Sequence, residues 1–486
     1  MHTAMLTAMV LALVLLQPAA SNQGKVIEIE GTLTAADRLT WIERPFEVPA
    51  GTARIDVETS FTDGDGGTAL EFGLYDPVRF RGASRFSKSR FFVSRTAATA
   101  SYTAGELQPG RWRLLIGVPS IRDGVTSKYK VQVRLTPEGP GQPPVTELQP
   151  GSALQGPRWY QGDLHTHTLH SDGFGCADGR GGAGPCAVHQ VIDAAVRRGL
   201  DFVGVTDHNT TSHHQDLATL QLQHDRLLLV RGQEVTSFYG HANVFGTSEI
   251  VDFRIGHPGV TASSVLAQAR ALGGLLTINH PARETGEKCT GCGWNAPNTD
   301  WSQVEALEVV NMFTVSGPTA GEPFWHARLN EGHRITGVGG SDDHGAATRA
   351  GSAVGTPTTV IHAAALSEAA LLSGIRAGRV YIKVRGPEGP DFEFTAPVIR
   401  AAMGDVVKLQ SAQQGVAFRV QAKRALGQRV EVIRNGAVVA DAVPQPIASV
   451  DATVEFSINV GRGDWVRVNL RDTAGPTLLA NPIYFR

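Results

Sequence analysis

Clusters of His, Asp and Glu in the middle of the chain stand where short apolar runs end, and this placement constrains the fold. Apolar runs at 202–205, 227–230 and 275–278 alternate with helical patterns at 188–198 and 262–272. Such alternation predicts an α/β region with a parallel sheet or barrel, whose functional loops lie at the carboxyl ends of the strands. Of the 16 histidines, only His2 and His362 lie outside this region. The six clusters occupy residues 163–173, 206–209, 233–234, 240–243, 279–281 and 340–344.

Length and charge limit the class of protein. A chain of 486 residues is expected to form roughly three domains. The formal net charge is −2, the pI is about 6.8 and no run of Lys or Arg occurs, so neither nucleic acid nor an anionic membrane is the expected partner. A small-molecule substrate fits better. The sequence leaves the oligomeric state open.

The periodicity changes twice along the chain. Residues 25–137 alternate apolar and polar side chains in short runs between turn clusters, which predicts an N-terminal β-sandwich. A Pro/Gly-rich stretch within 138–158 is typical of a linker, and the metal-rich α/β domain is expected to span 159–384. After a second Gly/Pro linker, short alternating strands predict a C-terminal β-sandwich over 391–486.

The first residues and the cysteines both indicate an exported protein. Residues 5–16 are apolar apart from Thr7 and precede small residues, so residues 1–21 are predicted to be a signal peptide rather than a spanning helix. The mature protein is then secreted or periplasmic, without stable membrane insertion. Four cysteines remain, and in an oxidising compartment one or two loop-stapling disulfides are favoured over a four-cysteine zinc site. They are Cys176, Cys186, Cys289 and Cys292.

The spacing of the clusters predicts a site for more than one metal ion. Residues two apart on a strand point to the same face, so His165 and His167 can converge on one ion, as can Asp342 and His344. Glu234 can bridge two cations. Imidazoles combined with carboxylates suit divalent transition metals such as Zn, Mn or Fe in a hydrolytic site. We therefore expect two or three such ions.

A single residue is weaker evidence for a metal site than the six clusters together. A lone histidine is more often a structural residue than a ligand, but the shared strand-end context reverses this for the clusters. Asp207 and Asp343 alternate away from their neighbouring histidines, so we expect them to orient ligands rather than bind metal. Arg283 could contact an anionic substrate, although an ordinary exposed arginine is the simpler interpretation.

These motifs resemble the PHP superfamily, named for polymerase and histidinol phosphatase, and within it the CehA/McbA-like branch. The resemblance covers about 159–384 and implies a distorted (β/α)7 barrel flanked by the two β-sandwiches. It implies three metal positions. Among the ligands, Glu234, Asp342 and His344 are predicted to serve catalysis directly. The implied ligand sets are His165, His167, Glu234 and Asp342; Glu234, His241 and His280; and Asp172, His208 and His344.

Three functions remain open from the sequence. The first is a metallohydrolase of phosphoesters, because a clamp of two or three cations suits in-line displacement at a charged centre. The second is a carbamate or carboxylic ester hydrolase, which the CehA/McbA resemblance implies for some members. The third is a non-catalytic surface binding protein, which would predict missing ligands. The cysteine-bearing insertion at 174–186 departs from the family pattern and is predicted to lie at the mouth of the pocket.

Overall fold

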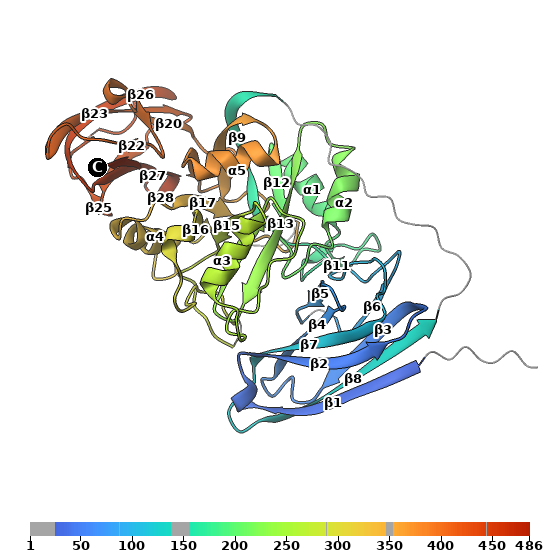
Figure 1. Cartoon of the computed structure of the whole chain (residues 1–486). Coiled ribbons are helices and arrows are strands. Elements are labelled where there is room, and N and C mark those ends of the chain that lie inside the picture. Colours follow the sequence, from blue (N-terminus) through green and yellow to red (C-terminus); the bar gives the residue numbers. More distant parts are fainter. Residues whose placement is uncertain (1–24, 87, 138–154, 288, 347–352, 444) are drawn as a thin grey trace, which may run out of the picture.

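A computed structural model describes residues 25–86, 88–137, 155–287, 289–346, 353–443 and 445–486. The chain forms a central α/β region with a β-rich module on either side of it (Figure 1). The predicted signal peptide and most of the linker at 138–158 lie outside the described residues. Within the described part, no helix is both long and apolar enough to cross a membrane.

The N-terminal module consists of two four-stranded antiparallel sheets, in the orders β1-β8-β3-β6 and β2-β7-β4-β5. Alternation buries one set of side chains between the sheets, including Trp112, Leu114 and Val133. A short 3-10 helix, Ala35–Asp37, connects β1 to β2. The strands are β1 Lys25–Thr34, β2 Thr40–Val48, β3 Thr52–Phe61, β4 Ala69–Tyr75, β5 Phe80–Ser84, β6 Arg90–Ser94, β7 Gly110–Ser120 and β8 Thr126–Pro137.

Seven neighbouring strands form the central part of the sheet in the order β17-β16-β15-β14-β13-β12-β9. All neighbours are parallel except that β14 runs antiparallel to both β13 and β15. The residues after β17 return to β9 through a parallel bridge between Asp343 and Thr166. The strands are β9 Gln155–Thr166, β12 Phe202–Val205, β13 Leu228–Ser237, β14 Gly240–Phe245, β15 Leu275–Ile278, β16 Ala306–Asn311 and β17 Thr336–Gly340.

The described residues contain too few helices to show the distorted (β/α)7 barrel that the resemblance implies. A two-residue turn joins β13 to β14, and no helix fits into so short a connection. Residues 279–305, between β15 and β16, hold only the 3-10 helix Trp301–Gln303. The predicted strands at 202–205 and 275–278 are confirmed, as are the helices near 188–198 and 262–272. The helices are α1 Val188–Arg197, α2 His214–Gln221, α3 Ala262–Ala271, α4 Gly321–Asn330 and α5 Glu368–Arg376.

The C-terminal module continues the central sheet. On the far side of β9 the order runs β18-β19-β28-β27-β24-β25, with β29 beside β27 and β22 beside β29. A separate four-stranded sheet, β21-β20-β23-β26, covers it, and the 3-10 helix Pro397–Ile399 lies between β20 and β21. The strands are β18 Thr358–Ala365, β19 Val380–Lys383, β20 Asp391–Ala396, β21 Ala401–Ala402, β22 Val406–Val407, β23 Gln413–Lys423, β24 Arg429–Arg434, β25 Ala437–Val438, β26 Asp451–Gly461, β27 Trp465–Asp472, β28 Gly475–Ala480 and β29 Ile483–Phe485.

All four cysteines are paired, Cys176 with Cys186 and Cys289 with Cys292. The first bridge closes the hairpin of β10 Phe174–Ala177 and β11 Ala183–Pro185. The base of this hairpin lies against the metal-ligand loop after β17, because the amide of Phe174 donates to the carbonyl of His344 at 2.7 Å. The predicted disulfides are therefore present.

Candidate metal centre

The structure brings all nine predicted ligands to one edge of the central sheet. His165 is the last residue but one of β9, and His167 directly follows the strand. His208, His280 and Asp342 lie beyond the ends of three other parallel strands. Two placements differ from the prediction. Glu234 lies within β13 rather than at its end, because that strand continues into the hairpin. His241 lies near the beginning of β14, and only the antiparallel direction of β14 brings this beginning to the same edge.

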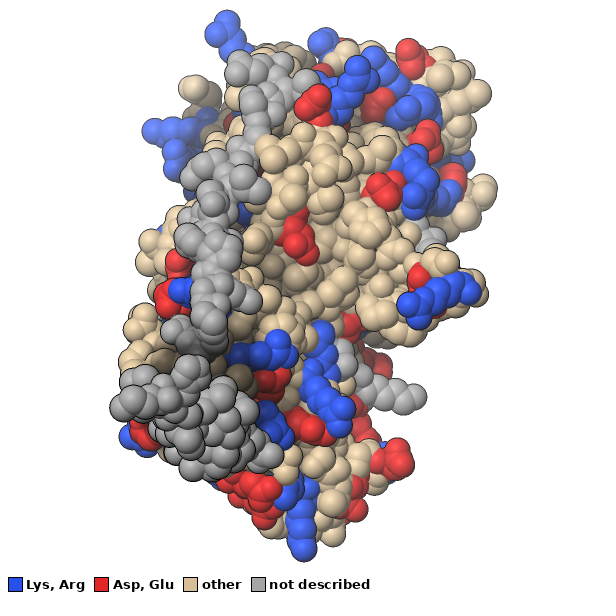
Figure 2. All heavy atoms as spheres, turned by 90° about the vertical axis from the view of Figure 1, so that its right-hand side faces the viewer, with Lys and Arg blue, Asp and Glu red and all other residues tan. Residues whose placement is uncertain are grey.

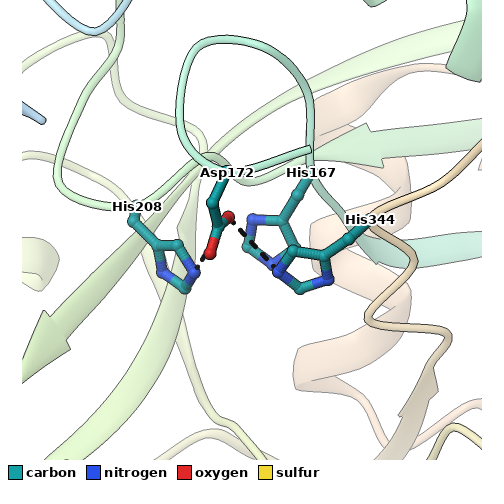
Figure 3. A group of neighbouring side chains, drawn as sticks. All are labelled: His167, Asp172, His208 and His344. Carbon is teal, nitrogen blue, oxygen red and sulfur yellow. Dashed lines mark ion pairs between the residues drawn. The ribbon is translucent and has the colours of Figure 1, made fainter. Parts of the chain in front are cut away.

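The ligands form four overlapping groups, in each of which one donor atom per residue lies within 4.8 Å of the others. The groups correspond closely to the three implied sets. The main difference concerns His167, which also faces the third set (Figure 3). The groups are His167, Asp172, His208 and His344; His165, His167 and Glu234; His165, His280 and Asp342; and Glu234, His241 and His280.

Distances between donor atoms match the spacing around a metal ion. His165 Nε2 lies 3.6 Å from Glu234 Oε1 and 3.4 Å from Asp342 Oδ1. His344 Nε2 lies 3.3 Å from Asp172 Oδ1, and His208 Nε2 lies 3.5 Å from the same oxygen. Two ligands at about 2.1 Å from a tetrahedral ion are separated by about 3.4 Å. The spacing is therefore too long for strong hydrogen bonds but suits a shared ion.

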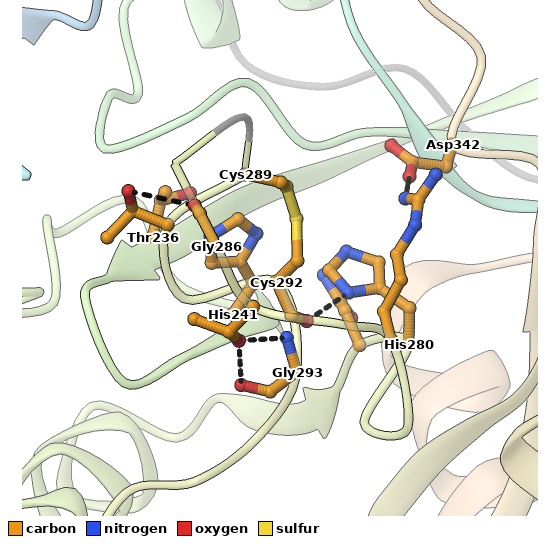
Figure 4. Close-up of a disulfide and its surroundings, with 12 residues drawn as sticks. Thr236, His241, His280, Gly286, Cys289, Cys292, Gly293 and Asp342 are labelled. Atoms are coloured by element: carbon orange, nitrogen blue, oxygen red, sulfur yellow. Dashed lines mark hydrogen bonds and ion pairs between the residues drawn. A yellow bond between two sulfur atoms is a disulfide. The ribbon is translucent and has the colours of Figure 1, made fainter. Parts of the chain in front are cut away.

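Outer contacts fix which imidazole nitrogen faces the centre. His165 Nδ1 lies 3.0 Å from Glu308 Oε1, and His280 Nδ1 lies 2.7 Å from the carbonyl of Cys292. His344 Nδ1 lies 2.8 Å from the carbonyl of Asp342. In each case Nδ1 carries the donated proton, so the lone pair is on Nε2 and faces the other ligands. Figure 4 shows His280 beside the Cys289–Cys292 turn that supplies its acceptor.

Several donor atoms at the centre are buried without a hydrogen-bond partner in the described residues. They include His165 Nε2, His167 Nε2 and both ring nitrogens of His241, together with Glu234 Oε2 and Asp172 Oδ1. An unsatisfied buried polar atom costs about 1–3 kcal/mol, so a concentration of them requires an explanation. Metal ions would satisfy these atoms together. The donor set therefore fits the ions predicted from the sequence.

Two ligands lie on strained backbone. His280 has φ +28° and Asp342 has φ +52°, in a region that non-glycine residues seldom adopt. Such strain costs on the order of 1–3 kcal/mol and persists where the surrounding structure holds it. At His280 the carboxylate of Glu308 accepts from the backbone amide at 3.0 Å and thus helps to hold this conformation.

The centre keeps its carboxylates ionised, and its imidazoles divide into two classes. Burial alone would raise the pKa of Glu234, but His208, His165 and His241 hold it well below its usual range. Burial lowers the pKa of the His241 imidazole to about 3, although Glu234 opposes this. Burial likewise lowers the pKa of His167 to about 4, with help from His344 and His208. For His165, His208 and His344 burial also lowers the pKa, but neighbouring carboxylates outweigh it and raise the pKa, to about 10 for His208. A cation that binds there takes the place of the protons on these three imidazoles.

Asp207 and Asp343 both accept hydrogen bonds within loops that carry ligand histidines. Asp207 accepts from the Thr168 amide at 2.8 Å and from the Ser171 hydroxyl at 2.6 Å, which holds the loop after His167. Burial opposes its ionisation, but nearby histidines, His213 first, lower the pKa of Asp207 to about 2. Asp343 accepts from the amide of Gly345 at 2.9 Å, within the loop that carries His344.

Arg283 lies at the centre and donates to Asp342 Oδ2 at 3.0 Å (Figure 4). Its side chain is 39% exposed, and it lines a cavity of about 260 Å³ together with His280, Glu308 and Asn311. A substrate group bound in this cavity would lie next to both a metal ligand and a guanidinium.

Sequence reasoning missed two residues that the structure places at the centre. Glu308 is buried in β16 and contacts the imidazole of His165 and the amide of His280. A lone carboxylate within the apolar run 306–310 was an available signal for it. The other residue is Arg85 of the N-terminal module, whose Nη1 lies 3.2 Å from His208 Nε2. No local pattern in the sequence indicates this contact.

No family model and no curated protein matches the chain. Two solved structures are similar to parts of it. A two-domain protein from Bacteroides vulgatus, described as containing a predicted PHP-like metal-dependent phosphoesterase, shares 18% identity and has a TM-score of 0.37 over 70% of this chain and 98% of its own. A candidate metal-dependent phosphoesterase from Bifidobacterium adolescentis shares 15% identity, with a TM-score of 0.26 over 40% of this chain and 91% of its own. These scores are low, so any function rests on the site itself.

Proposed function

We propose that the chain is a multi-metal-dependent hydrolase that acts on phosphoesters. The observation that carries this proposal is the central position of Glu234. Its Oε1 lies 3.6 Å from His165 and from His280, and its Oε2 lies 3.5 Å from His167. One carboxylate thus faces ligands of neighbouring groups, as a bridge between two cations must.

The nine ligand residues would hold two or three divalent ions such as Zn, Mn or Fe. Bound ions would lower the pKa of a water molecule and neutralise charge that develops on the reacting group. The chain itself contributes fixed ligand positions through Glu308 and Asp207, which hold imidazoles and loops in place. His344 and Asp172 are the most exposed ligands, with side chains 20% and 35% exposed, so substrate would approach from their side.

A phosphoester suits this centre better than a neutral ester or a carbamate. Two arginines, Arg85 and Arg283, lie within hydrogen-bond distance of ligand side chains. Guanidinium groups match the oxygens of a phosphoryl group in charge and geometry. The carboxylates of the centre offset part of the charge of the cations and arginines, and an anionic substrate would offset more of it than a neutral one. The domain resembles a PHP-type barrel in which a hairpin and a loop replace regular helices.

We also propose that the protein acts outside the cytoplasm. Two disulfides support an oxidising compartment, since such bridges are rare where thiols are kept reduced. The apolar residues 5–16 support export through a cleaved signal peptide. Denatured, unreduced protein is expected to show almost no titratable thiol.

Metal analysis together with a substrate screen tests the function. We expect two or three equivalents of transition metal per chain, and hydrolysis of a phosphomonoester or phosphodiester that a chelator abolishes. Carbamates and carboxylic esters are included in the same screen. Preferential hydrolysis of either would assign the other hydrolase function, and less than about one equivalent of metal under replete conditions would contradict the metal centre.

A further inference from the structure

The N-terminal module reaches the metal centre through Arg85. This residue follows β5 and its Nη1 lies 3.2 Å from His208 Nε2, the nitrogen that also faces Asp172. The Arg85 side chain is 12% exposed, so it is largely shielded from water. A charged group from a separate module therefore lies beside the ligand group of His167, Asp172, His208 and His344.

An ion pair with Glu71 of β4 accounts for part of the contacts of this guanidinium. Glu71 Oε1 lies 3.6 Å from Arg85 Nε, which is longer than a hydrogen bond. Nε is buried and has no hydrogen-bond partner among the described residues. The ring nitrogen of His208 has one lone pair, which can serve either the arginine or a metal ion. When a metal ion takes this lone pair, Arg85 Nη1 loses that acceptor and can donate to a bound ligand.

The position of the module is fixed by contacts to two of the three loops that carry His167, Asp172, His208 and His344. Lys88 Nζ donates to the carbonyl of Leu169 at 3.2 Å, and Ser101 Oγ donates to the carbonyl of His170 at 2.5 Å. Thr210 Oγ1 donates to the carbonyl of Ser101 at 2.9 Å. Asp172 and His208 lie on these same two loops. The distance between Arg85 and the ligands is therefore set by the fold.

Charged side chains gather where the N-terminal module meets the central region, whereas the face of the central region above it is mostly uncharged (Figure 2). Glu71 and Asp172 offset part of the positive charge that Arg85 and bound divalent cations would bring to this place. A bound anion would offset more of it. Two parallel N–H donors of a guanidinium also match two oxygens of a phosphoryl group.

We propose that Arg85 binds the anionic group of the substrate at the His167, Asp172, His208 and His344 group, so that the N-terminal module completes the active site. This inference rests on the proposed phosphoesterase function for the identity of the anion. It assigns the module a role in substrate binding beside the residues of the central region. Arg283 would contact the substrate from the Asp342 side.

Phosphate binding tests the proposal independently of turnover. Inorganic phosphate is titrated by calorimetry into metal-replete wild type, Arg85→Ala, Arg85→Lys and Arg90→Ala, and metal content is measured for each protein. Arg90 is the matched control, since it lies on the same module and pairs with the exposed Glu58. We expect Arg85→Ala to keep its metal and to bind phosphate about 10- to 100-fold more weakly, the loss expected for one charge-assisted hydrogen bond. Arg85→Lys should recover part of the affinity, and Arg90→Ala should resemble wild type.

The outcomes separate this proposal from the proposed function. Phosphate affinity that depends on Arg85 supports the role of the residue even if no phosphoester in the screen is hydrolysed. Wild-type phosphate affinity in both Arg85 variants overturns it, as does absence of phosphate binding by the wild type. Loss of metal in Arg85→Ala and Arg85→Lys alike also overturns it, because Arg85 would then support the ligands instead. With an active phosphoester, the Arg85 variants should raise KM more than they lower kcat.

Discussion

The two flanking modules are both built from β-strands, but they join the central region in different ways. The C-terminal module continues the central sheet, since β28 pairs with β19 through backbone hydrogen bonds. The N-terminal module shares no strand pairing with the central region among the described residues and docks through side chains. Trp41, for example, stacks on Phe238 at the β13–β14 turn, with ring centroids 4.4 Å apart. The shared sheet holds the C-terminal module rigidly against the central region. Docking through side chains allows the N-terminal module to place a residue such as Arg85 beside the metal centre.

The C-terminal junction also contains buried charge that is fully used within the protein. Arg467 on β27 is 0% exposed and contacts Glu322 of α4, His326 and Asn469. Its donors therefore have partners across the junction, unlike the buried Nε of Arg85. This difference suggests that the C-terminal module stabilises the fold and that the N-terminal module serves the site. The following variants test that division, from the largest expected effect to the smallest.

Glu234→Gln should have the largest effect and should leave both modules folded. Loss of an outer partner of a ligand alone costs about 10- to 100-fold in metal affinity or activity, so loss of the bridging carboxylate should exceed about 100-fold. Metal content and turnover are measured together with circular dichroism. The exposed Glu249→Gln is the matched control. Wild-type metal content in Glu234→Gln would remove Glu234 from the bridging position.

Arg467→Met should lower stability without affecting the site. Removal of one partner of a buried ion pair costs about 3–5 kcal/mol, because Glu322 is left without its arginine. Denaturant unfolding measures this change, and the double variant with Glu322→Gln should recover part of it. Arg419→Met, which breaks an exposed pair with Glu455, should cost no more than about 1 kcal/mol. A changed metal content or phosphate affinity in Arg467→Met would link the C-terminal module to the site.

Trp41→Ala should weaken docking of the N-terminal module and, through it, phosphate binding. Trp41 is 7% exposed and also contacts Phe253 edge-on, so its removal should cost about 3 kcal/mol. Because Arg85 is then held less firmly, phosphate affinity should fall while metal content stays the same. Phe61→Ala, an exposed position of the same module, is the control. If Trp41→Ala loosens the N-terminal module but leaves phosphate affinity unchanged, Arg85 either binds phosphate without help from docking or does not bind it.

The sequence predicted best what is local. Apolar runs such as 202–205 identify buried strands, and a ligand such as His208 lies within three residues of its strand end. Strands that are parallel then converge at one edge, which brings together ligands far apart in sequence. The antiparallel direction of β14 was harder to predict from the sequence. His241 lies near the beginning of this strand rather than after its end, and the two-residue turn before it has no clear sequence signal. Between β15 and β16 a long loop takes the place of a helix, and its sequence has no hydrophobic periodicity from which its path could be predicted.

Contacts between modules could not be predicted in the same way. Arg85 is separated from His208 by 123 residues, and its own surroundings in the sequence contain other basic residues such as Arg81, Lys88 and Arg90. Which of these basic residues faces the site depends on docking of Trp41 and Ser101, which only the folded arrangement determines. Glu308 differs, because a carboxylate within an apolar strand carries a cost that indicates a buried partner. Its partner His165 lies 143 residues away and has no local mark.

The smallest effect is expected from an exposed ion pair across the C-terminal junction, Arg385 with Asp472 of β27. Hydrogen bonding to Arg385 lowers the pKa of Asp472 to about 2 from 3.8. A lowered folded-state pKa contributes stability that is present above about pH 4 and is lost as the pH falls through about 2. Solvent screens this pair, so Asp472→Asn should cost less than about 1 kcal/mol at pH 6.

Denaturant unfolding of wild type and Asp472→Asn at pH 6 and at pH 2.5 checks the sign of this effect. The difference between the two proteins should shrink at the lower pH, because Asp472 of the wild type becomes partly protonated there. Comparison within one pH cancels the effects of metal release and of other carboxylates, which both proteins share. A cost at pH 6 as large as that of Arg467→Met would mean that exposed charge, rather than the shared sheet and the buried arginine, holds the C-terminal junction together.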